Sequence, residues 1–478
     1  MTLADKQNTE AYDLLVIGAG PAGEKGAAQA AYFGKRVAII EKGNLGGAVV
    51  NTGTLPSKTL RETALYLSGL KQRGLYGVDY CLNKEITVDN LFHRKKCVVD
   101  SHLDLVRDNI DRHKIELFQG VACLEDPWTV RVNNGDGSSL RLKGKYILIA
   151  TGSRPHQPAH VPFDGAYVYD SDSILNLERI PSSVLVIGAG VIGSEYTTVF
   201  AALGLPVTLV DGGERLLPFV DKEIADILLD QMRSLGVRVM FGRRVEGVQV
   251  RQDEDCVSVF LDGGEEVRVG AVLFCGGRGG NTGELELDKV GVKMGPRGRV
   301  EVNENFQTSV PNIYAAGDVI GFPALASTSM EQGRVAVCHA FSIEYKKCVS
   351  SLVPYGVYTI PEISMVGESE DSLAQNGQKY LVGRSSYKTN PRGQIMGDIS
   401  GLVKLLFRPE DQKLLGVHII GERASELIHI GQACMYFNGT LDFFIQNVFN
   451  FPTLSDVYKY AAYDGLGNLQ RYREGQES

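Results

Sequence analysis

The sequence contains no long apolar run. No window approaches the roughly 20 apolar residues that a helix needs to cross a bilayer. The first residues, MTLADKQNTEAYD, hold no apolar stretch of the kind found in signal peptides. We therefore expect a protein without a membrane span that resides in the cytoplasm.

An excess of basic residues is also missing. The formal net charge is -8 at pH 7 and the isoelectric point is near 5.6. Because sequence-independent binding to nucleic acid depends on clustered Lys and Arg, this composition argues against nucleic acid as a partner. An anionic ligand must instead be held by local backbone geometry.

Cysteines at the spacing of a zinc site or a local disulfide are absent as well. The eight cysteines form no CxxC or CxxxxC pattern, and such patterns are typical of those sites. We expect no metal site and mostly small buried or inert thiols. The cysteines are Cys81, Cys97, Cys123, Cys256, Cys275, Cys338, Cys348 and Cys434.

Glycine, in contrast, is abundant. The chain has 55 glycines among 478 residues, which indicates many tight turns or close approaches of the backbone to something else. The length exceeds that of one ordinary domain and predicts about two to four of them. The positions of the glycines therefore decide the interpretation.

One sequence pattern occurs twice, at a shift of 170 residues. Residues 14–41, LLVIGAGPAGEKGAAQAAYFGKRVAIIE, align with residues 184–211, VLVIGAGVIGSEYTTVFAALGLPVTLVD. In each copy an apolar run predicts a strand buried on both faces, a glycine turn opens a helix, and a second apolar run ends on an acid. Each copy predicts a βαβ unit.

Each copy also carries the GxGxxG fingerprint of a dinucleotide site. The glycines are Gly18, Gly20 and Gly23 in the first copy and Gly188, Gly190 and Gly193 in the second. They allow a tight turn, close approach of pyrophosphate and close helix packing. Glu41 and Asp211 each follow the first glycine by 23 residues, where a carboxylate accepts hydrogen bonds from a ribose hydroxyl. Two copies predict two dinucleotides, or one dinucleotide and one inactive copy.

The remainder of the chain favours two dinucleotides. Residues 146–155, YILIATGSRP, and 271–281, AVLFCGGRGGN, each predict a strand that runs into a glycine-rich turn. Such a turn suits the point where a strand end meets a cofactor, although a crossover between domains has the same appearance. In residues 313–321, IYAAGDVIG, Asp318 follows a strand and is interpreted as a ligand contact rather than only a helix cap.

These motifs, in this order, resemble the pyridine nucleotide-disulfide oxidoreductase family, which includes dihydrolipoamide dehydrogenase and glutathione reductase. The resemblance implies an α/β fold with two Rossmann-like domains, for FAD and for NAD(P), and a C-terminal α/β dimerisation domain that makes a homodimer. The implied ranges are 1–155 and 277–346 for the FAD domain, 156–276 for the NAD(P) domain and 347–478 for the dimerisation domain.

The resemblance also implies which residues contact each cofactor. Those against FAD are Gly18, Gly20, Gly23, Glu41, Lys42, Lys58, Ala122, Thr151, Gly152, Asp318 and Ala326. Those against the nicotinamide cofactor are Gly188, Gly190, Gly193, Glu195, Asp211, Val245 and Gly277.

Two departures from the family pattern bear on function. Disulfide-using members carry a segment like GGTCLNVGCIPSK, whereas this chain reads GGAVVNTGTLPSK, with Val49 and Thr54 at the cysteine places. They also carry HPTxxE from the partner subunit, where this chain has Phe451 and Asp456 at the ends of the motif. Neither Val nor Phe can form a thiolate or move a proton. We therefore expect no redox disulfide.

Among branches that lack the disulfide, the chain resembles the soluble pyridine nucleotide transhydrogenases, through GPAGEKGAA, GTLPSKTLRE, GERASELIHIGQA and FNFPTLSDVYKYAAYDGL. The resemblance implies hydride transfer between NADPH or NADH and NAD+ or NADP+ through flavin N5. Lys58 and Glu195 would form an ion pair beside N5, and Thr54 would contact the flavin. Alternatives are an NAD(P)H:quinone or other small-acceptor reductase, and a degenerate redox-sensing flavoprotein.

The preference between NAD(H) and NADP(H) stays open in the sequence. A carboxylate at Asp211 would repel a 2′-phosphate by about 4 kcal/mol at a separation of about 4 Å and an effective dielectric near 20. Arg215, four residues later, could offset this repulsion as a bidentate donor to phosphate. Alternatively, Arg215 is a surface residue that pairs with Glu214 or Asp221.

Overall fold

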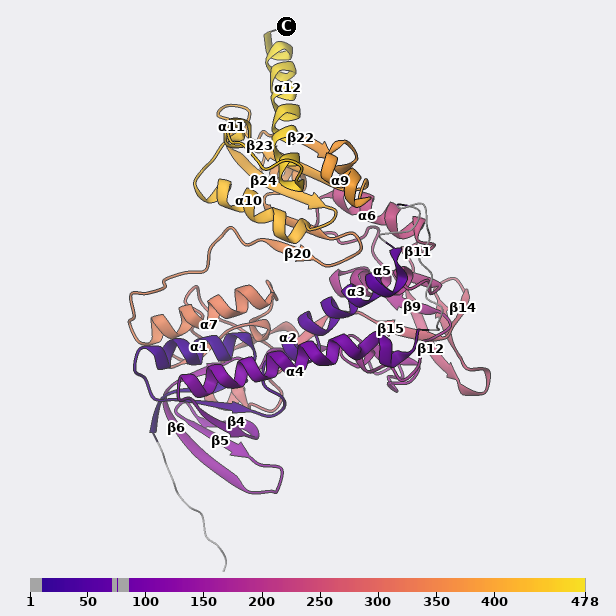
Figure 1. Cartoon of the computed structure of the whole chain (residues 1–478). Helices are drawn as coiled ribbons and strands as arrows, with labels where there is room; N and C mark the ends of the chain where they lie inside the picture. Colours follow the sequence, from indigo (N-terminus) through magenta and orange to yellow (C-terminus); the bar gives the residue numbers. More distant parts are fainter. Residues whose placement is uncertain (1–10, 71–74, 76–85, 478) are drawn as a thin grey trace, which may run out of the picture.

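The computed structural model describes residues 11–70, 75 and 86–477. Figure 1 shows three bodies: one built on β4, β5 and β6, one that contains β9 and β12, and one that contains β24, α10 and the protruding α12. The N-terminal residues 1–10, used above for the signal-peptide prediction, and Cys81 lie outside the described residues.

The first body contains a seven-stranded sheet in the order β3-β2-β1-β6-β5-β4, with β19 beside β6. The pairs of β1 with β2 and β6, of β2 with β3 and of β6 with β19 are parallel, whereas β4, β5 and β6 pair antiparallel. Its strands are β1 (Ala11–Ile17), β2 (Val37–Glu41), β3 (Glu116–Gln119), β4 (Val121–Asp126), β5 (Thr129–Asn133), β6 (Ser139–Ile149) and β19 (Ile313–Ala315).

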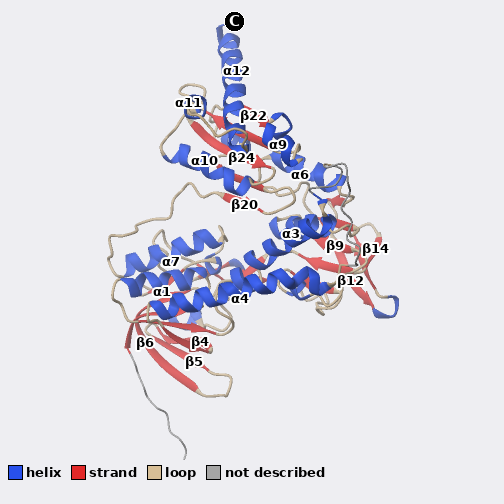
Figure 2. Ribbon diagram, in the orientation of Figure 1, coloured by secondary structure: helices blue, strands red, loops and turns tan. Residues whose placement is uncertain are grey.

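Helices cover this sheet in a layer that Figure 2 shows in blue. They are α1 (Pro21–Tyr32), α4 (Val88–Arg112) and α7 (Ala326–Ala340). The short α2 (Gly47–Asn51) leads into α3 (Thr54–Ser68), which extends toward the second body (Figure 1). Helices α1 and α7 lie backbone to backbone, because a Cβ at Gly333 would overlap the carbonyl oxygen of Ala22. Close packing of α7 against α1 therefore holds these two helices of the first body together.

The second body contains a parallel five-stranded sheet in the order β11-β10-β9-β15-β8. Its strands are β8 (Val168–Asp170), β9 (Val184–Ile187), β10 (Val207–Asp211), β11 (Arg238–Phe241) and β15 (Ala271–Phe274). An antiparallel sheet of β12 (Val245–Arg251), β13 (Cys256–Leu261) and β14 (Glu266–Val269) lies beside it, and the helices are α5 (Val191–Ala202) and α6 (Lys222–Ser234). Both predicted βαβ units are thus present.

Two short antiparallel ribbons accompany these bodies. The first pairs β7 (Ser153–Pro155) with β16 (Arg278–Gly280), so the chain leaves and re-enters the first body side by side. The second pairs β17 (Met294–Gly295) with β18 (Arg299–Val300).

The third body contains an antiparallel sheet in the order β20-β21-β24-β23-β22. Its strands are β20 (Tyr355–Val357), β21 (Ile363–Gly367), β22 (Leu381–Ser386), β23 (Leu402–Phe407) and β24 (Leu414–Ile420). Its helices are α8 (Glu370–Gln375), α9 (Pro391–Met396), α10 (Ala424–Tyr436), α11 (Leu441–Gln446) and α12 (Val457–Glu477).

One hydrophobic core crosses all three bodies. Leu60 from α3, Val186 from β9 and Ile363 from β21 belong to the same buried cluster, and each is at most 1% exposed. The predicted α/β architecture of two βαβ units and a C-terminal α/β body is confirmed. The domain limits at residues 155, 276 and 346 stay predictions.

Candidate functional site

A cavity of about 990 Å³ lies where the three bodies meet. Its walls come from the start of α1, the loop into α3, the end of β6, helix α5 and the segment between β20 and β21. Many predicted site residues line it together: Gly18, Gly20, Glu41, Lys42, Thr54, Lys58, Ala122, Thr151, Gly152, Glu195, Asp318 and Ala326.

The other predicted site residues do not line this cavity. They are Gly23, Gly188, Gly190, Gly193, Asp211, Arg215, Val245 and Gly277. Gly23 lies directly under Gly18, since a Cβ there would overlap the carbonyl oxygen of Gly18. Most of the rest belong to the second glycine turn and the strand ends around it.

The first glycine turn has the geometry of an anion cradle. Gly18 has a φ of +103°, and a Cβ on it would overlap the carbonyl oxygen of Ala150. Helix α1 begins behind Gly20 without a side-chain cap, so the N–H groups of its first turn point toward the cavity with their partial positive charge. A Cβ on Gly20 would meet only the Cα of Gly47, at 3.8 Å.

The cavity also contains an unsatisfied polar atom. The Oγ1 of Thr151 is buried without a hydrogen-bond partner among the described residues, and such an atom costs free energy unless a ligand or water binds it. Together with the uncapped helix and the open space at Gly20, it fits a bound dinucleotide.

The two predicted ribose acids have matching environments. Glu41 accepts hydrogen bonds from the N–H of Ala19 at 2.7 Å and of Gly43 at 2.8 Å. Asp211 accepts them from the N–H of Ala189 and of Gly213, both at 2.6 Å. Each carboxylate is thereby fixed in place, and its remaining lone pairs can accept hydrogen bonds from a ribose.

Lys58 and Glu195 form an ion pair inside the cavity. The Nζ of Lys58 lies 2.6 Å from Oε2 of Glu195, and the side chains are 26% and 8% exposed. Lys58 stands in the second turn of α3 and Glu195 in α5, so the pair joins the first body to the second. The contact expected from the family pattern is therefore made.

The C-terminal body contributes a third residue, Tyr358, to this ion pair. The N–H of Tyr358 donates to Oε1 of Glu195 at 2.8 Å, and the ammonium of Lys58 lies 5.0 Å from the centroid of the Tyr358 ring.

The two residues after Tyr358 are also hydrogen-bonded to the other bodies. Ile360 N donates to Thr198 at 3.1 Å, and Arg61 donates to the carbonyl of Thr359 at 2.9 Å. Sequence reasoning missed this segment because a backbone donor has no sequence signature.

Arg278 links the bodies on the other side of the cavity. Its guanidinium pairs with Asp172 at 2.8 Å and donates to Ser153 Oγ at 2.9 Å. Ser153 in turn donates to Asp318 at 2.9 Å. The glycine-rich turn after β15 was recognised in the sequence, but the partners of its Arg come from distant segments that spacing does not reveal.

Two other reactive side chains near Glu195 are inactive at neutral pH. Burial raises the pKa of the Tyr196 hydroxyl well above its usual value, and Cys275 and Glu195 add to the shift. Burial also raises the pKa of the Cys275 thiol far above its usual value. Neither group loses a proton at neutral pH, so no thiolate forms at Cys275.

Val49 and Thr54 lie at the cavity, at the places where the family pattern has cysteines. The cysteines within the described residues are all free, and none of them lines the cavity.

Phe451, at the histidine place of the family's HPTxxE motif, is 70% exposed on the C-terminal body. His429 lines the cavity and contacts Gln432 at 2.9 Å.

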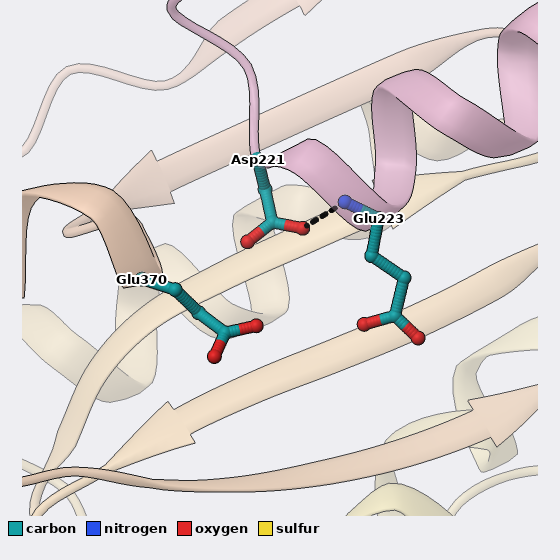
Figure 3. Close-up of side chains that lie close together, drawn as sticks. All are labelled: Asp221, Glu223 and Glu370. Carbon is teal, nitrogen blue, oxygen red and sulfur yellow. Dashed lines mark hydrogen bonds between the residues drawn. The ribbon is translucent and has the colours of Figure 1, made fainter.

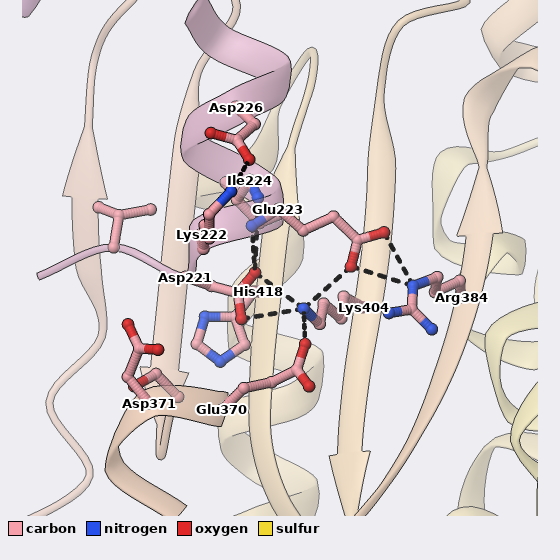
Figure 4. A network of polar contacts seen from close by, with 12 residues as sticks. Asp221, Lys222, Glu223, Ile224, Asp226, Glu370, Asp371, Arg384, Lys404 and His418 are labelled. Carbon is pink, nitrogen blue, oxygen red and sulfur yellow. Dashed lines mark hydrogen bonds and ion pairs between the residues drawn. The ribbon is translucent and has the colours of Figure 1, made fainter. Parts of the chain in front are cut away.

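Three carboxylates gather away from this cavity, where α6 meets the C-terminal body. Figure 3 shows Asp221, Glu223 and Glu370, and each offers an oxygen within 4.8 Å of the others. Three such oxygens could hold a metal ion. Figure 4 shows, however, that the ammonium of Lys404 points into the middle of this group.

Lys404 occupies the cation position of that cluster. Its Nζ lies 2.9 Å from Asp221 and from Glu223 and also contacts Glu370, and its side chain is 1% exposed. Burial alone would lower the pKa of Lys404, but the hydrogen bonds that its ammonium donates to Glu370 and Asp221 outweigh burial and raise it. The ion pairs of Asp221 and Glu223 with Lys404 therefore attach α6 of the second body to β23 of the C-terminal body.

Within the described residues, no helix combines the length and the apolar character that a membrane crossing requires.

Two family models match the chain. The model described as pyridine nucleotide-disulphide oxidoreductase matches residues 12–333, and the dimerisation domain of the same description matches residues 353–462.

Curated relatives resemble nearly the whole chain. The soluble pyridine nucleotide transhydrogenase of Mycobacterium tuberculosis (strain ATCC 25177 / H37Ra) is 46% identical over 461 residues, which cover 96% of this chain and 98% of the relative. That of Colwellia psychrerythraea is 40% identical over 462 residues, with 96% and 98% covered.

Solved structures share the fold. LpdA of Mycobacterium tuberculosis superposes with a TM-score of 0.87 at 26% identity, over 94% of this chain and 99% of that one. The HOCl-induced flavoprotein disulfide reductase RclA of Escherichia coli gives a TM-score of 0.84 at 28% identity, over 94% and 99%. The predicted fold class is confirmed.

Proposed function

Because the chain belongs to the pyridine nucleotide-disulphide oxidoreductase family, we propose that it is an FAD-dependent transhydrogenase that moves hydride between NADPH or NADH and NAD+ or NADP+. The family makes it an FAD-dependent oxidoreductase that uses nicotinamide dinucleotides. The narrower assignment rests on the relatives that carry the transhydrogenase name and on Val49 and Thr54, which line the cavity where disulfide-using members have cysteines.

The protein contributes positions and charges to this reaction. The flavin, when bound, supplies the hydride chemistry. The first glycine turn, Glu41 and the start of α1 would hold the FAD pyrophosphate and ribose, and the second turn with Asp211 would hold the nicotinamide nucleotide. Lys58 would place a cation beside the reacting ring, and Glu195 would fix that cation at 2.6 Å.

We propose that the transfer needs no protein disulfide. Val49 and Thr54 stand where a dithiol would lie, and Thr54 at the start of α3 can offer its hydroxyl to the flavin. The thiol of Cys275 stays protonated because burial raises its pKa. Hydride exchange between two nicotinamides requires no general acid, so the absence of a proton donor at Phe451 is consistent with this reaction.

The dimerisation domain supports a homodimer. We propose that this dimer works in the cytoplasm. The relatives are called soluble, and the free thiols within the described residues suit a reducing compartment.

The test is a pair of measurements on the purified holoenzyme. First, NADH and NADPH are each mixed with it under anaerobic conditions, and we expect both to bleach the flavin absorbance. Second, reduction of thio-NAD by NADPH is compared with reduction of a soluble quinone by NADH, and we expect the nicotinamide reaction to be faster.

Three outcomes would contradict the proposal. Faster reduction of the quinone would identify a small-acceptor reductase, and no bleaching by either nucleotide would identify a redox-inactive flavoprotein. Inhibition of the reduced enzyme by arsenite, which binds dithiols, would show that a redox disulfide takes part after all.

A further inference from the structure

The proposed function, on which this inference rests, sets an electrostatic problem. One site must accept both NAD(H) and NADP(H), yet Asp211 stands where the two nucleotides differ by a 2′-phosphate. Its two oxygens accept N–H groups of Ala189 and Gly213 at 2.6 Å. These bonds hold the carboxylate in place without cancelling its charge, so a cation must reach the phosphate.

Arg215 is already engaged. Its guanidinium donates to the carbonyl oxygens of Pro218 and Val220 and lies 3.2 Å from Asp371 in the C-terminal body. To reach a ligand at Asp211 it would have to leave these partners.

Arg243 is engaged as well. It pairs with Asp262 at 2.8 Å and with Glu265 at 3.1 Å, and it also donates to the carbonyl of Asp262. The hydrogen bond with Asp262 raises the pKa of Arg243. This arginine therefore holds the turn between β13 and β14 and is not available to the nucleotide.

Arg244 differs from both. Its side chain is exposed. Within residues 11–70, 75 and 86–477 its guanidinium makes no hydrogen bond or ion pair, although its charge helps to lower the pKa of Asp262 nearby. It follows β11, whose Phe241 pairs with Asp211. The side chain lies over Gly212, with its Cγ 3.5 Å and its Nε 3.9 Å from where a Cβ of Gly212 would be.

The stem of Arg244 crosses the turn that follows the ribose acid, at ordinary van der Waals distance from Gly212. Because Arg244 remains solvated when it has no ligand, it imposes little cost on a nucleotide that lacks the phosphate. A solvated cation beside a fixed carboxylate suits a site that takes both nucleotides.

We propose that Arg244 is a specificity-determining residue that binds the 2′-phosphate of NADP(H). Its guanidinium donates to the phosphate oxygens while Asp211 stays bound to the backbone N–H groups. NAD(H) uses Asp211 in the same site and makes no contact with Arg244.

The test compares two fragments of the nucleotides on the holoenzyme. Binding of 2′,5′-ADP and of 5′-AMP is measured by calorimetry for the wild type, Arg244→Ala and Arg244→Lys. For Arg244→Ala we expect binding of 2′,5′-ADP to weaken about tenfold or more, as for loss of a charge-assisted hydrogen bond, and binding of 5′-AMP to stay the same. Arg244→Lys should keep part of the affinity, because it keeps the charge but not the bidentate geometry.

A matched control and a competing variant make the result specific. Arg233→Ala removes an equal charge from the exposed end of α6, where Arg233 pairs with Asp230 at 3.5 Å, and it should leave the affinity for both fragments unchanged. Unchanged affinity of Arg244→Ala for 2′,5′-ADP, or a selective loss in Arg215→Ala alone, would overturn the proposal. A wild type that binds 2′,5′-ADP through Arg244 but transfers no hydride would contradict the proposed function and leave this inference standing.

Discussion

The two dinucleotide-binding units have the same turn but different surroundings. Gly18 and Gly188 have φ values of +103° and +109°, and both following helices begin without a side-chain cap. Gly18 and Gly20 of the first turn line the central cavity, whereas Gly188 and Gly190 of the second do not, although Val191 and Ile192 behind them do. This difference is consistent with an FAD that stays bound at the first turn and a nicotinamide nucleotide that exchanges at the second.

The two units are also fastened differently. The first contains the backbone contact between α1 and α7 at Gly333. The second is bound to the C-terminal body through the buried ammonium of Lys404. The same glycine fingerprint therefore does not determine how long each nucleotide stays bound. We expect the residence time to depend on the residues that surround each turn.

The strongest test places one methyl group in each turn. Gly20 and Gly190 have φ values of −73° and −76°, which alanine adopts freely, and a Cβ on Gly190 would meet no protein atom within 4 Å. The fold should therefore tolerate Gly20→Ala and Gly190→Ala. We expect the first variant to purify without flavin and the second to keep its flavin but lose reduction by NADH and NADPH. Loss of flavin from both, measured by absorbance, would show that the two sites are not separable.

Substitutions of Lys58 test the ion pair with Glu195 that joins the two units. For Lys58→Met we expect the rate of flavin reduction to fall about 100-fold, since a cation beside the developing charge is lost. The affinity for NADH should stay the same. Lys58→Arg keeps the charge and should recover part of the rate. Stopped-flow absorbance measures both, and an unchanged rate in Lys58→Met would exclude a role for the ammonium.

Lys404 tests the attachment of the second unit. Lys404→Met leaves three carboxylates facing one another and should destabilise the fold by about 3 kcal/mol, seen as a lower Tm. Lys222→Met, on the exposed side of α6, should have little effect, because its pair with Asp226 is a surface pair.

The pH dependence gives a second check on Lys404. Its folded-state pKa is raised above 10.5, so its contribution is complete below that pH and is lost as pH rises through the folded value. The difference in Tm between wild type and Lys404→Met should thus persist from neutral pH to about pH 10 and shrink at higher pH. A difference that grows with pH would contradict the assignment.

Local pattern predicted most of the fold. Both βαβ units follow from apolar runs, glycines and acids that are neighbours in the sequence, whereas the C-terminal α/β body was implied only by the resemblance to a family. The contact between Lys58 and Glu195, 137 residues apart, could be expected only through resemblance to a family. Tyr358 and Lys404 could not be predicted, because a backbone donor and a lone lysine in a strand acquire their partners only when separate bodies come together.

The hydrogen bond from Tyr358 to Glu195 links the cavity to the C-terminal body. A peptide group of that body holds the carboxylate that in turn holds the ammonium of Lys58. We therefore expect the geometry of the Lys58–Glu195 pair to depend on the position of the C-terminal body, although neither residue of the pair belongs to that body.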